Sequence, residues 1–454
     1  MGDYESEKQM QHEQISPQTI FALATSAGRA GVAVIRVSGS DAGSVLCALS
    51  GRKLPAPRIA RLRILKDQNG DTLDQALVLW LPGPGSFTGE DMVELHTHGS
   101  VAVIEAVSHA LYGLGLRQAA PGEFTRRAFE NGKLDLTEAE GLADLIDAQS
   151  EGQRRQALRQ MGGGLREIYE GWRGLILDAL AMVEGEIDFP DEDDVPDALA
   201  HRAAPGLAEL ASKLKAALQD SNRGEKVRSG LDIAIIGAPN AGKSSILNRL
   251  ARRDAAIVSA QAGTTRDIVE IHMHIAGLPV RFSDTAGLRE TDDSVEAEGV
   301  KRARLRARDA DIRLGVIDLT SNNNAVLDAL TVDDFVVYNK ADIGKAPKQN
   351  VSRETFLVSA ETGAGFADLE TALERAIISR FAQTEQAGLT RARHVACVRK
   401  ALCAIENACE NLAIAPELAG ADLRVALHAI KELAGEADIE AVLDRVFSQF
   451  CIGK

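Results

Sequence analysis

The residues with the clearest chemistry form the sequence G-x-x-x-x-G-K-S, from Gly237 to Ser244. Its glycines allow backbone N–H groups to close around phosphate oxygens, and a helix that begins there adds positive partial charge. Lys243 is expected to pair with the β- and γ-phosphate oxygens, and the Ser244 hydroxyl to coordinate Mg²⁺. Residues 231–236 predict a buried strand before the loop and residues 245–252 a helix after it, which is the order that a phosphate-binding loop requires.

Two further segments carry groups for the magnesium ion and the γ-phosphate. Residues 263–267, G-T-T-R-D, contain Thr265, whose hydroxyl can complete the magnesium coordination. Residues 281–283 predict a strand that leads into D-T-A-G at 284–287. Asp284, at the strand end, can hold the water shell of the magnesium ion, and Gly287 can offer its N–H to the γ-phosphate.

A second pair of segments selects the base. A short apolar strand, 335–338, ends in N-K-A-D at 339–342. The Asp342 carboxylate can accept two hydrogen bonds from guanine N1–H and the 2-amino group, a donor pair that adenine lacks. Ser359 and Ala360 follow another short strand and supply the backbone contact to the guanine oxygen. All five segments in this order predict a GTP site.

The predicted nucleotide contacts form one set. They are Asn240, Ala241, Gly242, Lys243, Ser244, Ser245, Ser259, Ala260, Gln261, Ala262, Gly263, Thr264, Thr265, Asp284, Thr285, Ala286, Gly287, Asn339, Lys340, Asp342, Ser359 and Ala360. Within this set, Ser244 and Thr265 are the predicted magnesium ligands.

One position departs from the commonest GTPase plan. Leu288, which cannot orient an attacking water, follows the D-T-A-G segment where glutamine is usual. Glu290 is the nearest polar candidate for that catalytic role; its alternative is a solvated loop carboxylate. No arginine finger is evident. The Asn240 side chain could instead ligate a potassium ion, whose charge would stand in for an arginine; its alternative is loop geometry alone.

The potassium shell would be completed by backbone carbonyls of the loop 259–264. The assigned ligands there are Ser259, Gln261 and Thr264, beside Asn240. Backbone ligands tolerate variation in the side chains of that loop.

Strands near 231–236, 268–275, 279–284, 311–319, 335–338 and 356–358 alternate with helical stretches, which predicts a doubly wound Ras-like α/β domain with ligands at the carboxyl ends of its strands. In the second strand, apolar residues alternate with Glu270, His272 and His274, so one face is buried and the other wet. We therefore interpret the two histidines as solvated residues and not as metal ligands.

Composition limits the other possibilities. A chain of 454 residues needs two or three domains, and 4% aromatic residues favour aliphatic, largely helical cores. Five widely spaced cysteines without C-x-x-C predict reduced thiols and a cytoplasmic protein, and no apolar run is long enough to predict a membrane span. The net charge of −15 opposes broad non-specific binding to nucleic acid. A nucleic-acid substrate would need a local basic patch or a partner protein.

The chain divides into segments of different character. Residues 137–226 and 383–454 have helical spacing and flank the nucleotide domain, which suggests one helical domain with an α/β insertion. Thr137 and Glu140 predict a capping box at the start of the first helix, and 162–164, G-G-G, predicts a break. The predicted divisions are a disordered 1–16, an α+β domain 17–136, a first helical part 137–226, a GTPase domain 227–382, and a second helical part 383–454 that ends in C-I-G-K.

At this point the chain resembles the MnmE (TrmE) family of tRNA-modification GTPases over nearly its whole length after residue 17. The residues that carry the resemblance lie outside the nucleotide domain. They are G-V-A-V-I-R-V-S-G at 31–39, F-T-G-E-D-M-V-E-L at 87–95 with H-G at 98–99, P-G-E-F-T-R-R-A-F at 121–129, K-L-D-L at 133–136 and C-I-G-K at 451–454.

The resemblance implies an N-terminal domain that mediates dimerisation and binds 5-formyl- or 5,10-methylene-tetrahydrofolate. Arg36, Glu94 and Lys133 would contact the folate, with Lys454 nearby; a carboxylate suits a pterin amine and cations suit folate carboxylates. Surface salt bridges are the alternative for the cations. Cys451 would be a functionally required residue of the tail, against the alternative of a chance thiol on a frayed terminus.

The resemblance also implies potassium-stimulated, dimerisation-dependent GTP hydrolysis in which Glu290 positions water. The expected partner is the FAD-dependent protein MnmG. Together the two would add an aminomethyl or carboxymethylaminomethyl group to carbon 5 of the wobble uridine in certain tRNAs. GTP turnover would drive a conformational cycle and not the carbon transfer itself.

Two other functions stay open. A ribosome-assembly GTPase of the Era type would share the nucleotide domain, yet predicts a basic RNA-binding domain after it, whereas residues 383–450 are mixed in charge. A folate-dependent aminomethyl transferase with an attached GTPase would act without MnmG.

Overall fold

The computed structural model describes residues 19–188, 199–251, 270–284, 308–321, 325–344, 353–381, 388–437, 440–448, 450 and 452–453. The chain forms two compact units, residues 1–143 with 431–454, and residues 144–430. The predicted disordered start, residues 1–16, lies outside the described residues. The finer three-domain division stays a prediction.

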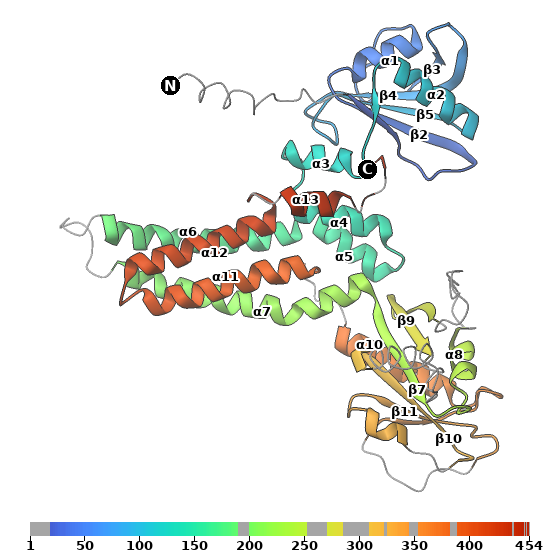
Figure 1. The fold of residues 1–454 in the computed structure, drawn as a ribbon, viewed down its shortest axis with the longest axis vertical. Coiled ribbons are helices and arrows are strands. Elements are labelled where there is room, and N and C mark those ends of the chain that lie inside the picture. The colour runs from blue at the N-terminus through green and yellow to red at the C-terminus, as the bar shows by residue number, and fades with distance from the viewer. Residues whose placement is uncertain are drawn as a thin grey trace, which may run out of the picture. The chain divides into compact units, whose positions relative to one another are not determined.

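The first unit contains a six-stranded sheet in the order β3-β4-β5-β2-β1-β6 (Figure 1). Its strands are β1 (Ile20–Leu23), β2 (Ala30–Ser38), β3 (Arg61–Lys66), β4 (Thr72–Leu81), β5 (Met92–Gly99) and β6 (Arg117–Gln118). The helices α1 (Ala42–Ser50) and α2 (Val101–Gly113) pack on one face, where Ile35, Leu65 and Leu95 are fully buried. Alternation along β2 and β5 therefore turns Arg36, Glu94 and their neighbours to the other face. The predicted α+β character is confirmed.

A second apolar cluster in this unit joins distant parts of the chain. It brings α3 (Glu123–Glu130) and the start of α4 (Leu136–Asp147) together with α13 (Glu440–Phe447). Leu136 and Ala139 are fully buried there beside Phe447 and Phe450. Arg126 adds ion pairs across the same junction to Glu440 and Asp444.

The predicted capping box at the start of α4 is wrong by two residues. The Asp135 carboxylate accepts the Glu138 N–H at 2.8 Å, and the Glu138 carboxylate accepts the Asp135 N–H at 2.8 Å. Asp135 is therefore the N-cap. The D-x-x-E sequence from Asp135 to Glu138 can form the same reciprocal bonds as the T-x-x-E sequence from Thr137, and it begins two residues earlier. Thr137 lies inside the first turn and donates to the same Asp135 carboxylate.

The helices of the second unit that lie outside its sheet domain form an antiparallel bundle (Figure 1). They are α5 (Glu151–Met161), α6 (Gly164–Asp188), η1 (Ala200–Ala203), α7 (Ala204–Ser229), α11 (Ala392–Asn411) and α12 (Pro416–Ala434). The predicted break at 162–164 separates α5 from α6. The ion pair of Arg424 with Glu184 joins α12 to α6. No helix within the described ranges is long and apolar enough to cross a membrane.

The second sheet has the order β12-β11-β10-β7-β9-β8, parallel except for the β8–β9 hairpin. Its strands are β7 (Leu231–Gly237), β8 (Glu270–Ile275), β9 (Leu278–Asp284), β10 (Ile312–Asp318), β11 (Phe335–Asn339) and β12 (Thr355–Leu357). The helices are α8 (Lys243–Ala251), η2 (Ala325–Ala329) and α10 (Phe366–Phe381). The predicted doubly wound domain is confirmed.

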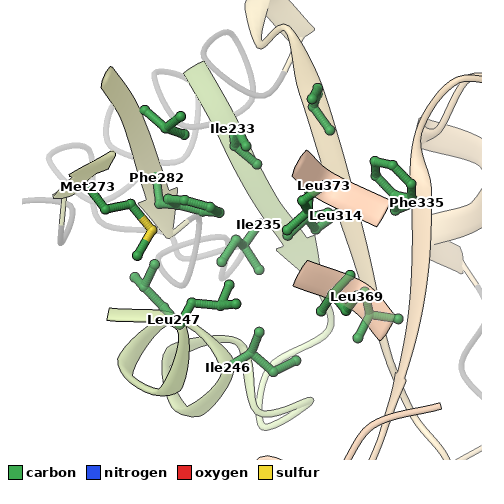
Figure 2. Close-up of a cluster of buried hydrophobic side chains, with 14 of the residues drawn as sticks. Ile233, Ile235, Ile246, Leu247, Met273, Phe282, Leu314, Phe335, Leu369 and Leu373 are labelled. Atoms are coloured by element: carbon green, nitrogen blue, oxygen red, sulfur yellow. The ribbon is translucent and has the colours of Figure 1, made fainter. Parts of the chain in front are cut away.

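The core of this domain explains why β7 lies in the interior of the sheet. Ile233 and Ile235 of β7 pack with α8 and α10 on one face, as Figure 2 shows, while Ala234 and Ile236 are buried on the other. A strand that is buried on both faces has to be continuously apolar, as residues 233–236 are. The central strand therefore delivers the phosphate loop from a rigid position at its carboxyl end.

Candidate nucleotide site

The phosphate loop joins β7 to α8. Gly237 admits no side chain, because an added Cβ would lie 2.4 Å from the Val316 carbonyl oxygen. Asn240 and Gly242 have φ values of 64° and 90°, so the loop turns through the left-handed region at both. Lys243, only 5% exposed, donates from Nζ to the carbonyls of Gly237 and Ala238, each at 3.0 Å. Its ammonium group is thus held over the loop, where a phosphate would need it.

Hydroxyl groups follow at the first turn of α8. Ser244 and Ser245 are exposed, although Lys243 before them is buried. An exposed hydroxyl at a helix N-terminus suits coordination of a magnesium ion beside bound phosphates. Within the described residues, no group of three or more His, Cys, Asp or Glu side chains could hold a metal ion. His272 is exposed on β8, as the alternation predicts.

Asn339 joins three of the predicted loops. It is 2% exposed, and its Nδ2 donates to the Ala241 carbonyl at 2.9 Å while its Oδ1 accepts the Ala360 N–H at 3.1 Å. The contact with the phosphate loop is close enough that a Cβ at Gly242 would lie 2.1 Å from Nδ2. One buried amide therefore fixes the spacing between the phosphate loop and the loop 359–360.

Lys340 is fixed by an acidic residue that the sequence analysis did not single out. Its Nζ lies 2.6 Å from Asp318 Oδ2, at the end of β10. Burial raises the pKa of the Asp318 carboxyl, but hydrogen bonds from Lys340 and Thr320 outweigh it, and the pKa lies below its usual range. Asp342, two residues further along the chain, is exposed. Parallel pairing of β10 with β11, which aligns Asp318 with Asn339, brings Asp318 and Lys340 together.

Arg249 of α8 is a second residue of this site that was not predicted from the sequence. Its guanidinium donates to the carbonyls of Ala360, Glu361 and Thr362 at 3.0, 3.2 and 3.1 Å. It also lies 5.6 Å from the centre of the Phe366 ring, a cation–π contact. The helix that begins at the phosphate loop thereby holds the loop that follows Ser359.

We expect Arg249→Ala to loosen the loop 360–362 and to speed release of GDP and GTP by about tenfold, because three charge-assisted hydrogen bonds are lost. Arg249→Lys should recover only part of the loss, since an ammonium cannot reproduce the planar fork. Stopped-flow release of a fluorescent nucleotide measures the effect. Arg375→Ala, which removes an exposed arginine from α10 of the same domain, is the control. Release rates equal to wild type would contradict the role.

Several predicted site residues lie outside the described residues. They are Ser259, Ala260, Gln261, Ala262, Gly263, Thr264, Thr265, Thr285, Ala286, Gly287, Glu290, Cys451 and Lys454. Asp284 ends β9, and its backbone is aligned with Ile235 of β7. β9 therefore ends beside β7, the strand that leads into the phosphate loop.

The predicted folate residues lie on the first unit. Arg36 Nε and Glu94 Oε1 are 2.9 Å apart, and His96 Nε2 is 3.1 Å from Glu94 Oε2. The three side chains are 17–29% exposed, so the carboxylate is held between two nitrogen groups on a surface that a ligand can reach. His96 was not among the predicted residues. Its signal was the alternation that places it on the same face as Glu94.

For Lys133 and the described part of the C-terminal tail, the structure gives the neighbouring residues and no contact with Arg36 or Glu94. Lys133 is exposed, and a Cβ at Gly89 would lie 3.5 Å from its Cε. A Cβ at Gly453 would lie 2.3 Å from the Leu23 carbonyl oxygen. Leu23 of β1 pairs with Ile35 of β2, next to Arg36. The tail between Cys451 and Lys454 thus passes beside the strand pair that carries one of the predicted folate contacts.

The fold and these loops together define the class of the protein as a P-loop GTPase with an additional α+β unit and helical bundle. Residues 136–451 match the family model described as the MnmE helical domain, and residues 19–133 match the N-terminus of the GTP-binding protein TrmE. The chain belongs to the MnmE family.

Curated relatives match over their full length. The chain is 55% identical to the tRNA modification GTPase MnmE of Maricaulis maris, over 96% of this chain and 99% of that protein. It is 50% identical to the protein of the same name from Paramagnetospirillum magneticum, over 96% of this chain and 100% of that protein.

Proposed function

We propose that this chain binds and hydrolyses GTP as part of tRNA modification. The observation that carries the proposal is the buried Asn339 amide, which ties the phosphate loop to the loop 359–360 in a chain of the MnmE family. Lys243 pairs with the phosphate oxygens, Asp342 accepts hydrogen bonds from guanine, and Glu290 orients the attacking water. The curated relatives bear the name tRNA modification GTPase, which supports tRNA as the macromolecular substrate.

The chemistry on the tRNA is the finer part of the proposal. With the FAD-dependent partner MnmG, the chain adds an aminomethyl or carboxymethylaminomethyl group to carbon 5 of the wobble uridine. The one-carbon unit comes from 5-formyl- or 5,10-methylene-tetrahydrofolate, bound by Arg36, Glu94, Lys133 and Lys454. The partly exposed Arg36–Glu94 pair supports this, since it offers an acceptor for a pterin amine beside a cation. Cys451 acts in the same tail.

The assembly and location complete the proposal. The chain works as a homodimer in the cytoplasm. Within the described residues, Cys47, Cys397, Cys403 and Cys409 form no disulfide, as a reducing compartment requires. Ser244 and Thr265 hold the magnesium ion, which neutralises phosphate charge.

Potassium occupies the side of the phosphate loop at Asn240, with Ser259, Gln261 and Thr264. The exposed position of Asn240 supports this, because its amide oxygen is accessible to an ion. We expect Asn240→Ala to remove most of the stimulation of GTP hydrolysis by potassium over sodium, while GDP affinity changes by less than about threefold. Asn248→Ala, an exposed asparagine on α8, is the control. Persisting stimulation would place the ion elsewhere.

The test of the function is mass spectrometry of tRNA nucleosides from cells that lack the gene. We expect the carbon-5-modified wobble uridines to disappear and to return with the intact chain. An unchanged nucleoside profile with defective ribosome assembly would reject modification and favour the Era-type switch. Modification by the isolated chain with folate and tRNA would instead remove MnmG from the reaction.

A further inference from the structure

A short segment of the first unit concentrates positive charge in an acidic protein. Between residues 52 and 66 there are six cations and no carboxylate, in a chain whose net charge is −15. The cations are Arg52, Lys53, Arg58, Arg61, Arg63 and Lys66. All are exposed except Arg63, which is half-buried. We call them the basic edge.

The fold arranges these residues along one border of the sheet. β3 is the terminal strand, paired only with β4, and Arg61 and Arg63 stand opposite Val78 and Ala76. The chain before β3 continues the alignment, since the Arg58 N–H donates to the Trp80 carbonyl. β3 runs from Arg61 to Lys66, so at about 3.3 Å per residue its three cations extend over roughly 16 Å. This is a linear array and not a compact pocket.

The charges of the basic edge are not neutralised within the described part of the chain. No carboxylate lies within ion-pair distance of any of the six there, and Arg58 donates to the backbone carbonyl of Gly85. Cations elsewhere behave differently: Arg126 and Arg281, for example, pair with carboxylates of distant segments. A row of cations without counter-charges suits a partner that supplies regularly spaced negative charge.

We propose that the basic edge binds the phosphate backbone of the tRNA substrate, an inference that rests on the proposed function. Phosphate contacts from Lys and Arg release condensed counterions, so a local array can bind RNA although the whole chain is negative. The contacts position the tRNA without reading its sequence. The basic edge lies on the same unit as Arg36 and Glu94. Base recognition would be left to other groups.

The test compares two triple variants with equal change of charge. Arg61→Gln, Arg63→Gln and Lys66→Gln remove the strand cations and spare Arg58, which is bonded to the backbone. The control, Lys213→Gln, Arg223→Gln and Arg399→Gln, removes exposed helical cations of the second unit. Affinity for deacylated tRNA is measured by filter binding of full-length protein between about 50 and 300 mM KCl, with melting temperature and GTP hydrolysis recorded for each.

We expect the strand variant to bind tRNA about tenfold or more weakly near 100 mM salt, with the magnitude of the log–log salt slope reduced by about 2 to 3. The control should keep wild-type affinity and slope, and both should keep GTP hydrolysis. Equal behaviour of the two variants overturns the inference, and would leave the cations their other role of blocking edge-to-edge strand pairing. If the wild-type protein does not bind tRNA but gene loss still removes the modified uridines, this inference alone is overturned. An unchanged nucleoside profile overturns the proposed function.

Discussion

Asp342→Asn should lower GTP affinity by about 100-fold or more, the largest change in binding that a single site residue should give. The wild-type carboxylate accepts from both N1–H and the 2-amino group of guanine, whereas an amide presents one acceptor and one donor. The amide NH₂ would then face a guanine donor, and two donors left without acceptors in the bound complex cost about 3 kcal/mol. Xanthine carries a carbonyl in place of the 2-amino group, so XTP should bind the variant better than the wild type.

Competition between GTP, XTP and ATP for a fluorescent guanine nucleotide measures this exchange of specificity. Asp368→Asn removes an exposed carboxylate from α10 of the same domain and is the matched control. The exposed position of Asp342, next to the Lys340–Asp318 pair, allows the substitution without a buried defect. Unchanged preference for GTP over XTP would reject the assignment of Asp342 to the base.

Glu290→Ala should lower the turnover of GTP by about 100-fold or more while the affinity for GTP changes by less than about threefold. A residue that orients only the attacking water stabilises the transition state and contributes little to ground-state binding. Leu288 offers no polar group for this purpose. Glu290 lies outside the described part of the chain, so the prediction rests on its sequence position and on the family resemblance.

Single-turnover hydrolysis with saturating protein separates the chemical step from binding. Glu290→Gln keeps the shape and a hydrogen-bonding oxygen, and we expect it to retain more activity than alanine. Glu374→Ala, which removes an exposed carboxylate from α10 of the same domain, is the matched control. A parallel fall of turnover and affinity in Glu290→Ala would show that the residue shapes the site and does not position water.

The strands of the nucleotide domain were predictable to within two or three residues. Residues 233–236 form a continuous apolar run, and 270–275 alternate, so each pattern corresponds to one burial state. The start of α4 was not predicted correctly, because Asp135 and Thr137 both precede a glutamate by three residues. Local sequence cannot choose between two such boxes; the tertiary burial of Thr137 does.

Some residues of the candidate site could also be predicted from the sequence, and others could not. The chemical types of Lys243, Asn339 and Asp342 could be assigned from spacing alone, because these residues lie in contiguous motifs. Arg249 could not, since the carbonyls that it binds are more than a hundred residues away. The Asp318–Lys340 pair likewise depends on the parallel alignment of β10 with β11, which no local pattern specifies.

The first unit is assembled from both ends of the chain, and this has a consequence for its synthesis. Leu136 and Ala139 pack against Phe447 and Phe450, so their partners are made much later. At about 5–20 residues per second, the intervening residues 144–430 occupy the ribosome for roughly 15 to 60 seconds. During that interval, the nascent chain carries an apolar surface on α3 and α4 that lacks its α13 partner. The second unit can finish folding first, and a chaperone that protects the waiting surface would raise the yield of complete protein.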